Sequence, residues 1–484
     1  MPMPDYRKIE SELVRALARD RVSSSPEIKV THGYDASRLR GKPDVVCWPF
    51  STDEVSAICK VASAHGAPIV ARGAASGLTG GCVPEHGGIV VDFLRMNRVL
   101  SVDPVSGCAV VEPGILVDDF QAHLAPKGMF YAPDPGSSAY ATIGGNIAEN
   151  AGGMRAVKYG VTRDSVLALT CVLADGSVIR TGSRAHKCVA GFDLTRLICG
   201  SEGMLALITE AALKIIPLPK FTATVLAGFD SEGAALTAAA HVCSEGALPR
   251  ALEFADRKCI EVITGRAVPL AAASSGEPPK PIAPAPVAPL IGGDWKALIL
   301  AETDGATRES ADAEMALVKT VMEKYGARSI FQAADASERT KIWSARKTLA
   351  SALYNVAPVK LNEDIAVPRA ALAEFVAKST AEAEKRGLFF CNYGHVGDGN
   401  LHATVMLPDD RTETRAPAEE LVAFVFRLAL DLGGTISGEH GIGMTKRPFL
   451  SWEIGEAELD LMRRIKSLFD PQGILNPGKQ FPAS

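Results

Sequence analysis

Two stretches crowded with glycine and other small residues constrain this chain more than any other feature of its sequence. The first covers residues 71–81, directly after the apolar run 68–71, and the second covers residues 134–153. Because no Cβ blocks the approach and positive φ is accessible, backbone N–H groups in such stretches can converge on a pyrophosphate. Neither stretch has the Rossmann or Walker spacing. Together they predict a glycine-rich nucleotide cradle, although each alone also fits a series of tight turns.

Length and composition describe a globular protein of two or three domains. The chain has 484 residues, of which 47% are apolar and 22% charged, and it exceeds what one hydrophobic core usually serves. Its net charge of −5 indicates no basic stripe for nucleic-acid phosphates, so we expect no nucleic-acid partner. Among ten cysteines there is no Cys-x-x-Cys pair, which favours buried, reduced thiols over a zinc or iron–sulfur site.

The sequence carries no targeting or membrane signal of the usual kinds. Residues 1–12 are polar and of mixed charge, and no uninterrupted apolar run of about 20 residues is present for a bilayer span. We therefore expect a cytoplasmic protein without a transmembrane segment. Peripheral association with the inner membrane and a homodimer both stay open.

The first 219 residues are expected to form one α+β domain built around loops. The apolar runs 69–71, 88–92 and 109–112 predict strands, and residues 52–65 have the spacing of an amphipathic helix. Glycine-rich turns separate these segments until two prolines near residue 219 mark a boundary.

Residues 220–432 are expected to form a second, α/β domain that binds the substrate. Longer helical stretches, such as 309–325 and 369–386, alternate there with strands. Residues 267–293 are rich in Pro, Ala and Ser, which predicts a mobile surface insertion without a catalytic role. Residues 433–484 return to glycine-rich motifs and are expected to pack on the first domain.

A β-hairpin is predicted over residues 389–405. Asp398 and Gly399 form a favoured two-residue turn between apolar strands. A turn centred there places His395 opposite His402, with Cβ atoms about 4.5–5.5 Å apart on one face. Two imidazoles in that arrangement can share a metal ion. The alternative is a pair of stacked histidines.

A second polar pair stands in the glycine-rich segment 433–443. Glu439 and His440 are adjacent there, where neither is needed for a core. Two histidines and one glutamate make a common catalytic metal site that leaves positions open for substrate. We predict that His395, His402 and Glu439 bind a divalent metal, Zn or Mn, and that His440 stays free as a base.

The motifs of the first half resemble, in order and spacing, the FAD-binding domain of the vanillyl-alcohol oxidase superfamily. The resemblance covers roughly residues 42–218 and continues through Tyr159-Gly160 and the segment 200–205. It implies an α+β fold with a vanillyl-alcohol oxidase (PCMH)-type FAD-binding domain, an α/β cap domain and a C-terminal segment that returns to the FAD domain. The residues that it implies for FAD binding are Arg72, Gly73, Ala74, Ala75, Ser76, Gly77, Leu78, Thr79, Pro135, Gly136, Ser137, Thr142, Gly144, Gly145, Asn146, Ala151, Gly152, Gly153, Tyr159, Gly160, Val161, Glu202, Gly203, Ile208 and Asn476.

Non-covalent attachment of the FAD is expected. Some members of the superfamily bond the flavin to a histidine a few residues beyond the loop arginine. Here residues 72–76 contain neither histidine nor cysteine. The chain also departs from the family at Met204, where threonine is common.

The second-half motifs closely resemble those of the FAD-linked D-2-hydroxy acid dehydrogenases, a group that contains D-lactate dehydrogenase, the flavin subunit of glycolate oxidase and D-2-hydroxyglutarate dehydrogenase. The ending 468–479 matches as well. The resemblance implies that His395, His402 and Glu439 ligate a divalent metal and that His440 accepts the substrate proton.

A carboxylate substrate also needs a cationic anchor, which guanidinium supplies by bidentate binding. Arg346 stands where the family has its substrate arginine. Lys360 is a second candidate, and for it a solvated surface charge is an equal alternative, as it is for Lys347.

Substrate size and electron acceptor are less constrained. The glutarate-specific members have an asparagine where this chain has Thr404, so a small acid such as D-lactate or glycolate is favoured. Electrons are expected to pass to an external quinone, cytochrome, electron-transfer flavoprotein or partner subunit. The alternatives are a non-catalytic flavin subunit of an electron-transfer complex, a D-2-hydroxyglutarate dehydrogenase and an oxidase of phenolic alcohols.

Overall fold

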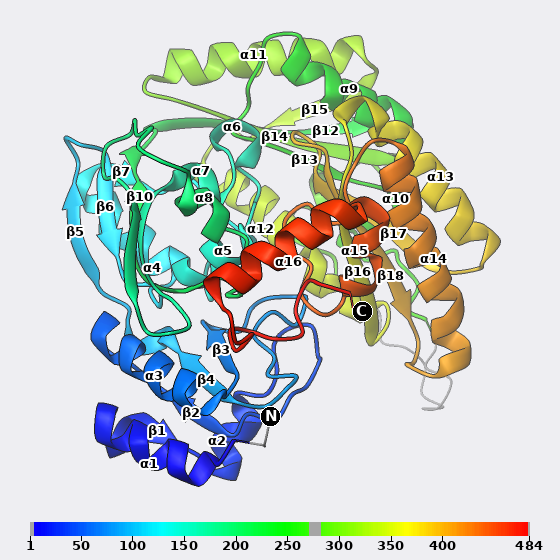
Figure 1. Ribbon diagram of the computed structural model, residues 1–484. Coiled ribbons are helices and arrows are strands. Elements are labelled where there is room, and N and C mark those ends of the chain that lie inside the picture. Colours follow the sequence, from blue (N-terminus) through cyan, green and yellow to red (C-terminus); the bar gives the residue numbers. More distant parts are fainter. Residues whose placement is uncertain (1–3, 271–281, 483–484) are drawn as a thin grey trace. The chain divides into compact units, whose positions relative to one another are not determined.

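The computed structural model describes residues 4–270 and 282–482, and the chain divides into two compact units (Figure 1). Unit 1 comprises Met1–Gly153, Gly160–Leu218 and Glu439–Ser484, and unit 2 comprises Met154–Tyr159 and Pro219–Gly438. The chain passes between the units at 218–219 and at 438–439, where the predicted limits were 219 and 432. Residues 154–159 form a short additional excursion into unit 2 that the sequence did not indicate.

Unit 1 is built from small sheets covered by helices. In its described part, one sheet has the order β1-β2-β4-β3, a second the order β5-β6-β10-β8-β9, and β7 pairs with β11. The strands are β1 (Val22–Ser23), β2 (Val45–Cys47), β3 (Ile69–Arg72), β4 (Ile89–Asp92), β5 (Val99–Asp103), β6 (Cys108–Val111), β7 (Met129–Phe130), β8 (Val166–Val172), β9 (Val178–Gly182), β10 (Leu207–Lys214) and β11 (Ile216–Pro217). The helices are α1 (Tyr6–Leu17), α2 (Pro26–Thr31), α3 (Thr52–His65), α4 (Val117–Leu124), α5 (Ile143–Glu149), α7 (Thr162–Ser165), α8 (Leu194–Ile198), α15 (Leu450–Glu453) and α16 (Glu456–Phe469).

Helix α3 shows how local sequence fixes an element of this unit. The Ser51 side chain caps its first turn by accepting a hydrogen bond from the Glu54 N–H at 3.3 Å, and Gly66 ends it in the left-handed region at φ 60°. Its apolar side chains, such as Val55 and Ile58, recur on one face and lie in the core with β2, β3 and β4. The predicted helix and the strands predicted around 69–71, 88–92 and 109–112 are confirmed.

Unit 2 contains one antiparallel sheet with helices on both faces, and the order of its strands differs from their order in the sequence. In the described residues the strand order is β15-β12-β14-β13-β17-β18-β16. These strands are β12 (Phe221–Phe229), β13 (Ala251–Ala255), β14 (Ala297–Gly305), β15 (Ala327–Gln332), β16 (Val359–Ala366), β17 (Phe389–His395) and β18 (Asn400–Leu407). The helices are α6 (Ala156–Tyr159), α9 (Glu232–Ser244), α10 (Arg257–Ile263), α11 (Arg308–Lys324), α12 (Ala336–Ala352), α13 (Leu372–Lys385) and α14 (Thr412–Asp431).

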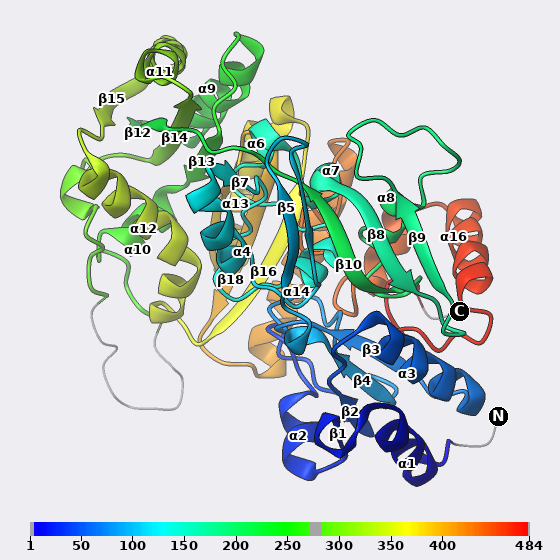
Figure 2. The same ribbon diagram turned by 90° about the vertical axis from the view of Figure 1, so that its left-hand side faces the viewer.

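The two faces of this sheet are covered by different helices. Helix α11 accepts a hydrogen bond from Thr303, and α13 contacts Asn392, on one face. Helices α10 and α12 pack together on the other face (Figure 2). The predicted helices at 309–325 and 369–386 are confirmed as α11 and α13, the latter preceded by a short 3-10 turn at Arg369–Ala371.

The predicted surface insertion needs correction at both ends. Of residues 267–293, the segment 271–281 lies outside the described residues. The flanks are part of the core beneath α10 and α12, where Ala267, Ile282, Val287 and Ile291 are buried. The Pro- and Ala-rich composition concealed these apolar anchors, whose side chains pack although the run lacks helical or strand periodicity.

Remaining expectations concern membranes, cysteines and surface charge. Among the residues described, no helix is both long and apolar enough to cross a bilayer.

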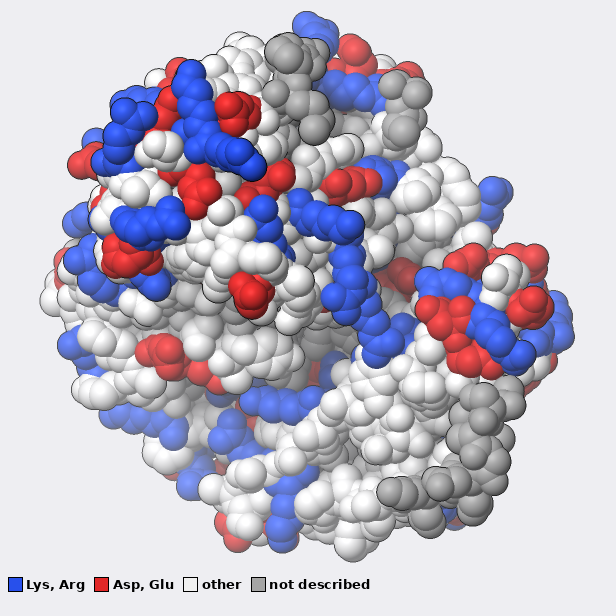
Figure 3. Space-filling model, turned by 90° about the horizontal axis from the view of Figure 1, so that it is seen from below, with Lys and Arg blue, Asp and Glu red and all other residues white. Residues whose placement is uncertain are grey.

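Seven of the ten free cysteines are buried as expected, whereas Cys188 is exposed. On the face drawn in Figure 3, basic and acidic side chains lie interspersed, as a net charge of −5 over 484 residues allows.

Candidate active site

A row of polar side chains crosses four neighbouring strands of the unit 2 sheet. Glu253 of β13 pairs with His395 of β17, and His402 of β18 pairs with both Tyr393 of β17 and Asp364 of β16. Because side chains alternate along a strand, His395 lies on the same face as Tyr393. Glu253, His395, His402 and Asp364 therefore share one face, and all four are at most 7% exposed.

The hairpin β17–β18 exists as predicted, but its predicted register is wrong. His402 lies opposite Tyr393 rather than His395, and the connection runs over residues 396–399. The carbonyl of Gly399 accepts a hydrogen bond from the N–H of Val367, the residue after β16, at 3.0 Å. Gly399 is therefore bonded to the chain beyond β16 and does not close a two-residue turn. A shift of two residues preserves the face. The rings of His395 and His402 consequently still meet edge to face, with centroids 5.5 Å apart.

The carboxylate of Glu253 joins two of the predicted site residues. Its Oε2 accepts a hydrogen bond from Nε of Arg346 at 2.6 Å, and its Oε1 lies 2.7 Å from Nδ1 of His395. Burial alone would raise the pKa of Glu253, but Arg346 and His395 outweigh it, and the pKa is lowered. The carboxylate of Glu253 therefore holds the side chains of both Arg346 and His395 in place. We did not select Glu253 from the sequence, and its acidic side chain within the apolar strand β13 was the one signal that would have indicated it.

Helix α12 reaches the sheet through a stripe of polar side chains. Arg339 and Trp343 both donate hydrogen bonds to Glu302 of β14, each at 2.7 Å, and Arg346 follows on the same side of the helix. Glu302 and Glu253 are 2% and 1% exposed. Two buried carboxylates on adjacent strands thus set the position of the helix that carries the predicted substrate arginine.

The opposite end of the polar row is organised by Asp364. Its Oδ1 accepts a hydrogen bond from Nδ2 of Asn400 at 2.6 Å, and its Oδ2 accepts one from the Ser437 hydroxyl at 3.2 Å. Asp364 is fully buried, whereas most residues of strand β16 are only partly buried. We did not select Asp364 from the sequence; its signal was again an acid inside a strand.

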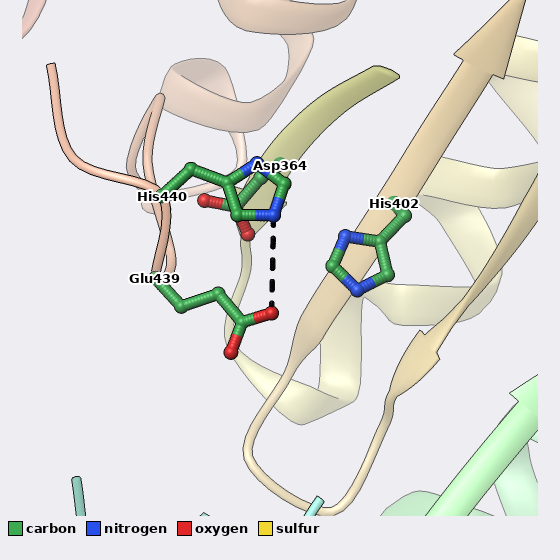
Figure 4. Close-up of side chains that lie close together, drawn as sticks. All are labelled: Asp364, His402, Glu439 and His440. Carbon is green, nitrogen blue, oxygen red and sulfur yellow. Dashed lines mark ion pairs between the residues drawn. The ribbon is translucent and has the colours of Figure 1, made fainter. Parts of the chain in front are cut away.

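Asp364, His402, Glu439 and His440 are drawn together in Figure 4. Each offers one ligand atom, and these atoms all lie within 4.8 Å of one another. Glu439 directly follows Gly438, where the chain leaves unit 2, and Nε2 of His440 lies 3.9 Å from Oε1 of Glu439. Of the predicted metal ligands, His402 and Glu439 belong to this group. His395 does not, and Asp364 takes a place that was not predicted.

Lys360 and Thr404 lie on the same sheet face but are engaged elsewhere. The ammonium of Lys360 donates to the Ala350 carbonyl at 3.1 Å and lies over the ring of Tyr354. The hydroxyl of Thr404 donates to Oδ1 of Asn362 at 2.6 Å. Lys360 thus fastens the end of α12 to β16, while Lys347 is exposed.

In unit 1 the two glycine-rich stretches meet. A Cβ added to Gly73 would lie 2.2 Å from Oγ1 of Thr142, so only glycine permits this approach. Thr142 caps α5 by accepting a hydrogen bond from the Gly145 N–H at 3.2 Å. Within the described chain, the backbone N–H groups of residues 74–77 have no hydrogen-bond acceptor. Such a loop suits the phosphates of a dinucleotide, which is the ligand predicted from the sequence.

Some of the residues assigned to FAD from the sequence also hold the surrounding backbone by hydrogen bonds. Arg72 donates to the carbonyls of Tyr34 and Thr31, at 2.7 and 3.2 Å. Asn476 donates to the carbonyls of Gly81 and Glu202. Of the predicted cofactor residues, Tyr159 alone belongs to unit 2, where its hydroxyl donates to Asp304 at 2.6 Å.

Three acids lie beneath the first loop. Burial raises the pKa of Asp35, and it raises the pKa of Glu149 well above the ordinary value, with Glu202 adding to that shift. Burial likewise raises the pKa of Glu202, against hydrogen bonds from the N–H groups of Ile442 and Gly443. These groups were not predicted as a cluster, because they come from distant parts of the sequence.

Comparison with protein families identifies both halves of the chain. Residues 43–182 match the model described as FAD binding domain, and residues 218–480 match FAD linked oxidases, C-terminal domain. The chain is 37% identical over 476 residues to glycolate oxidase subunit GlcD of Bacillus subtilis, covering 98% of this chain and 97% of that protein. It is 33% identical over 484 residues to D-lactate dehydrogenase of Anaerostipes hadrus, covering 98% of both.

Solved structures agree on the fold. The chain superimposes on p-cresol methylhydroxylase with a TM-score of 0.78 at 18% identity, covering 99% of this chain and 97% of the other. For 4-ethylphenol oxidase from Gulosibacter chungangensis the TM-score is 0.76 at 18% identity, with 99% of both chains covered. The predicted α+β fold of the PCMH type is thereby confirmed, and the FAD-binding match supports FAD as cofactor.

Proposed function

The chain belongs to the family of FAD-linked oxidoreductases that includes glycolate oxidase subunits and D-lactate dehydrogenases, and we propose that it oxidises a small D-2-hydroxy acid to the 2-oxo acid with the help of a divalent metal. The observation that carries the proposal is the group of Asp364, His402, Glu439 and His440, whose ligand atoms lie within 4.8 Å of one another. D-lactate and glycolate are the favoured substrates.

The donor atoms fit a divalent ion such as Zn²⁺ or Mn²⁺. Imidazole nitrogen and carboxylate oxygen are the ligands that both ions accept. In the proposal His402 and Glu439 hold the ion, and Asp364 is either a further ligand or the group that orients His402. His395 lies outside that group, and it is proposed as a third ligand because its ring meets the ring of His402, with centroids 5.5 Å apart. A divalent ion at this position would lower the pKa of the substrate hydroxyl.

The protein's own residues divide the remaining work. Oxidation of a 2-hydroxy acid removes the hydroxyl proton and the hydride on C2. In the proposal the guanidinium of Arg346 binds the carboxylate and the imidazole of His440 takes the proton. Bound FAD supplies the acceptor for the hydride.

Thr404 supports a small substrate. Its hydroxyl is bonded to Asn362, and its side chain is fully buried, so it offers no obvious partner for a second carboxylate. A short or apolar side chain on C2 therefore fits the proposal better than a diacid. Electrons are proposed to leave for an external quinone, cytochrome, electron-transfer flavoprotein or partner subunit.

Anaerobic bleaching of the FAD band tests the proposal. D- and L-2-hydroxy acids of increasing length are added to the purified protein, before and after chelation and after return of Zn²⁺ or Mn²⁺. Bleaching by short D-acids that is lost on chelation and restored by metal is the expected result. A protein whose flavin no 2-hydroxy acid reduces, with or without metal, would instead be a non-catalytic flavin subunit or act on phenolic alcohols.

A further inference from the structure

We propose that Glu253 is a positioning residue that holds the substrate arginine and a metal histidine in one rigid arrangement. The proposal rests on the function proposed above, because it assigns Glu253 a role toward Arg346 and His395. Its basis is the buried chain of hydrogen bonds from Arg346 through Glu253 to His395, with lengths of 2.6 and 2.7 Å.

The link to Arg346 leaves part of the guanidinium available. Nε is committed to Glu253, whereas Nη2 is buried and has no hydrogen-bond partner in the described part of the chain. A guanidinium has five N–H donors in a fixed plane, so holding Nε fixes the direction of the other four. Glu253 therefore aims the remaining donors of Arg346, as bidentate binding of a substrate carboxylate requires.

The link to His395 determines which ring nitrogen can bind a metal. Nδ1 of His395 lies 2.7 Å from Oε1 of Glu253, and a carboxylate oxygen in that position accepts a hydrogen bond from a protonated Nδ1. Nε2 then keeps its lone pair. Metal-binding histidines are commonly oriented in this way by a carboxylate on the other nitrogen, and loss of the partner typically weakens metal binding about 10–100-fold.

The surroundings of Glu253 make the arrangement stiff. A small pocket lined almost entirely by apolar side chains lies beside Glu253 and Arg346, and Leu226, Leu300 and Ile342 form part of its wall. Glu253 is 1% exposed and the Arg346 side chain 11% exposed. Water therefore competes little for either charge, and the hydrogen bonds are stronger than they would be at the surface.

Glu302 provides a matched control within the same layer. It binds the same helix through Arg339 and Trp343 and is equally buried, but it has no hydrogen bond to a histidine of the row. Loss of Glu302 should loosen α12 without altering His395. A role of Glu253 beyond holding the helix must therefore appear as a difference between the Glu253 and Glu302 variants.

The experiment compares Glu253→Gln, Glu253→Asp and Glu302→Gln in the FAD-loaded protein. Three quantities are measured: the Zn²⁺ and Mn²⁺ affinity of the chelated protein, the flavin-detected affinity for the 2-oxo acid in the absence of metal, and the urea midpoint. We expect Glu253→Gln to weaken metal binding about 10–100-fold and to weaken 2-oxo acid binding. Glu302→Gln should lower only the urea midpoint.

Glu253→Asp keeps the charge but shortens the side chain, so it should recover part of the metal affinity and guards against a Gln variant that fails to fold. Equal metal and 2-oxo acid affinities in wild type and Glu253→Gln would overturn the positioning role while leaving the proposed function intact. A wild-type protein that binds neither metal nor 2-oxo acid would overturn the proposed function and this assignment with it.

Discussion

The carboxylate of Glu202 accepts a hydrogen bond from the backbone N–H of Ile442 at 2.8 Å, and its second oxygen accepts one from Gly443 at the same distance. Glu202 lies in the segment 200–205 that the sequence assigns to the FAD domain, whereas Ile442 stands two residues after the proposed base His440. Both belong to unit 1. The backbone behind the proposed base is thus held by an acid in a cofactor motif.

Gly441 in this loop should not tolerate a side chain. It adopts φ +83°, and an added Cβ would lie 2.3 Å from Oε2 of Glu149. Gly441→Ala should lower stability by about 1–2 kcal/mol through backbone strain alone, with steric cost in addition, and should reduce kcat by displacing His440. Gly473→Ala is the control, because φ is +67° but nothing lies within 4 Å. Urea unfolding and turnover of both variants check this; equal effects would remove the special role of residue 441.

His440 should be needed for chemistry and not for holding the cofactor. General-base catalysis is worth about 10²–10⁴-fold in rate, so His440→Asn should reduce kcat by that range. The FAD spectrum and the flavin content should remain those of the wild type. Rapid-reaction measurement of flavin reduction by the best D-2-hydroxy acid supplies the rate. Turnover within twofold of wild type would assign the base elsewhere.

Arg346 should act mainly on substrate binding. Arg346→Lys keeps the charge but loses the planar fork and the Nε bond to Glu253. Hydrogen bonds to charged groups contribute about 1.5–3 kcal/mol, so KM should rise about 10–100-fold. Lys347→Met, one residue further along α12 and exposed, serves as the control and should leave KM unchanged. Steady-state kinetics with D-lactate measure both, and a normal KM in Arg346→Lys would refute the anchor.

Asp256 should make the stability of unit 2 depend on pH. Burial, followed by the nearby Glu232 carboxylate, raises its pKa to about 7, although it accepts hydrogen bonds from the N–H groups of Cys259 and Asn392. A carboxyl whose pKa is higher in the folded state binds its proton more tightly there. Stability is therefore lost as pH rises from 3.8, the ordinary pKa of an aspartate, to about 7.

Asp256→Asn removes this titration. The wild type should lose about 1.4 kcal/mol per pH unit through Asp256 inside that range, and the difference between the two proteins should become constant above it. The free energy of unfolding by urea at pH 5, 6, 7 and 8, followed by circular dichroism, gives the comparison. Parallel curves for the two proteins across all four pH values would contradict the shift.

Local patterns in the sequence predicted the elements but not their long-range pairing. The cap at Ser51 and the apolar spacing of Val55 and Ile58 are local, so the bounds of α3 followed from them. The register of the His395–His402 hairpin did not, because the Gly399 carbonyl accepts a hydrogen bond from Val367, which directly follows the distant strand β16. Turn preference at Asp398-Gly399 was outweighed by that tertiary contact.

The same reason explains which site residues escaped prediction. Glu253 and Asp364 reach the histidines only through the pairing of β13 with β17 and of β16 with β18. Sequence distance hides such neighbours, and each acid taken singly also fits an exposed strand position. A charged residue inside a short apolar strand was the one available signal. The metal-ligand set and the FAD contacts stay predictions until they are measured.

The passage of the chain from one unit to the other after Gly438 suggests a route for engineering. Residues 219–438 carry the proposed arginine anchor and both histidines of the row, whereas Glu439 and His440 are encoded with the cofactor unit. Exchange of residues 219–438 for the corresponding segment of a relative would replace the proposed substrate-binding residues in one step. The proposed base His440 would be retained. In a lineage, new substrates could arise by the same recombination, without any change in the residues that hold the flavin.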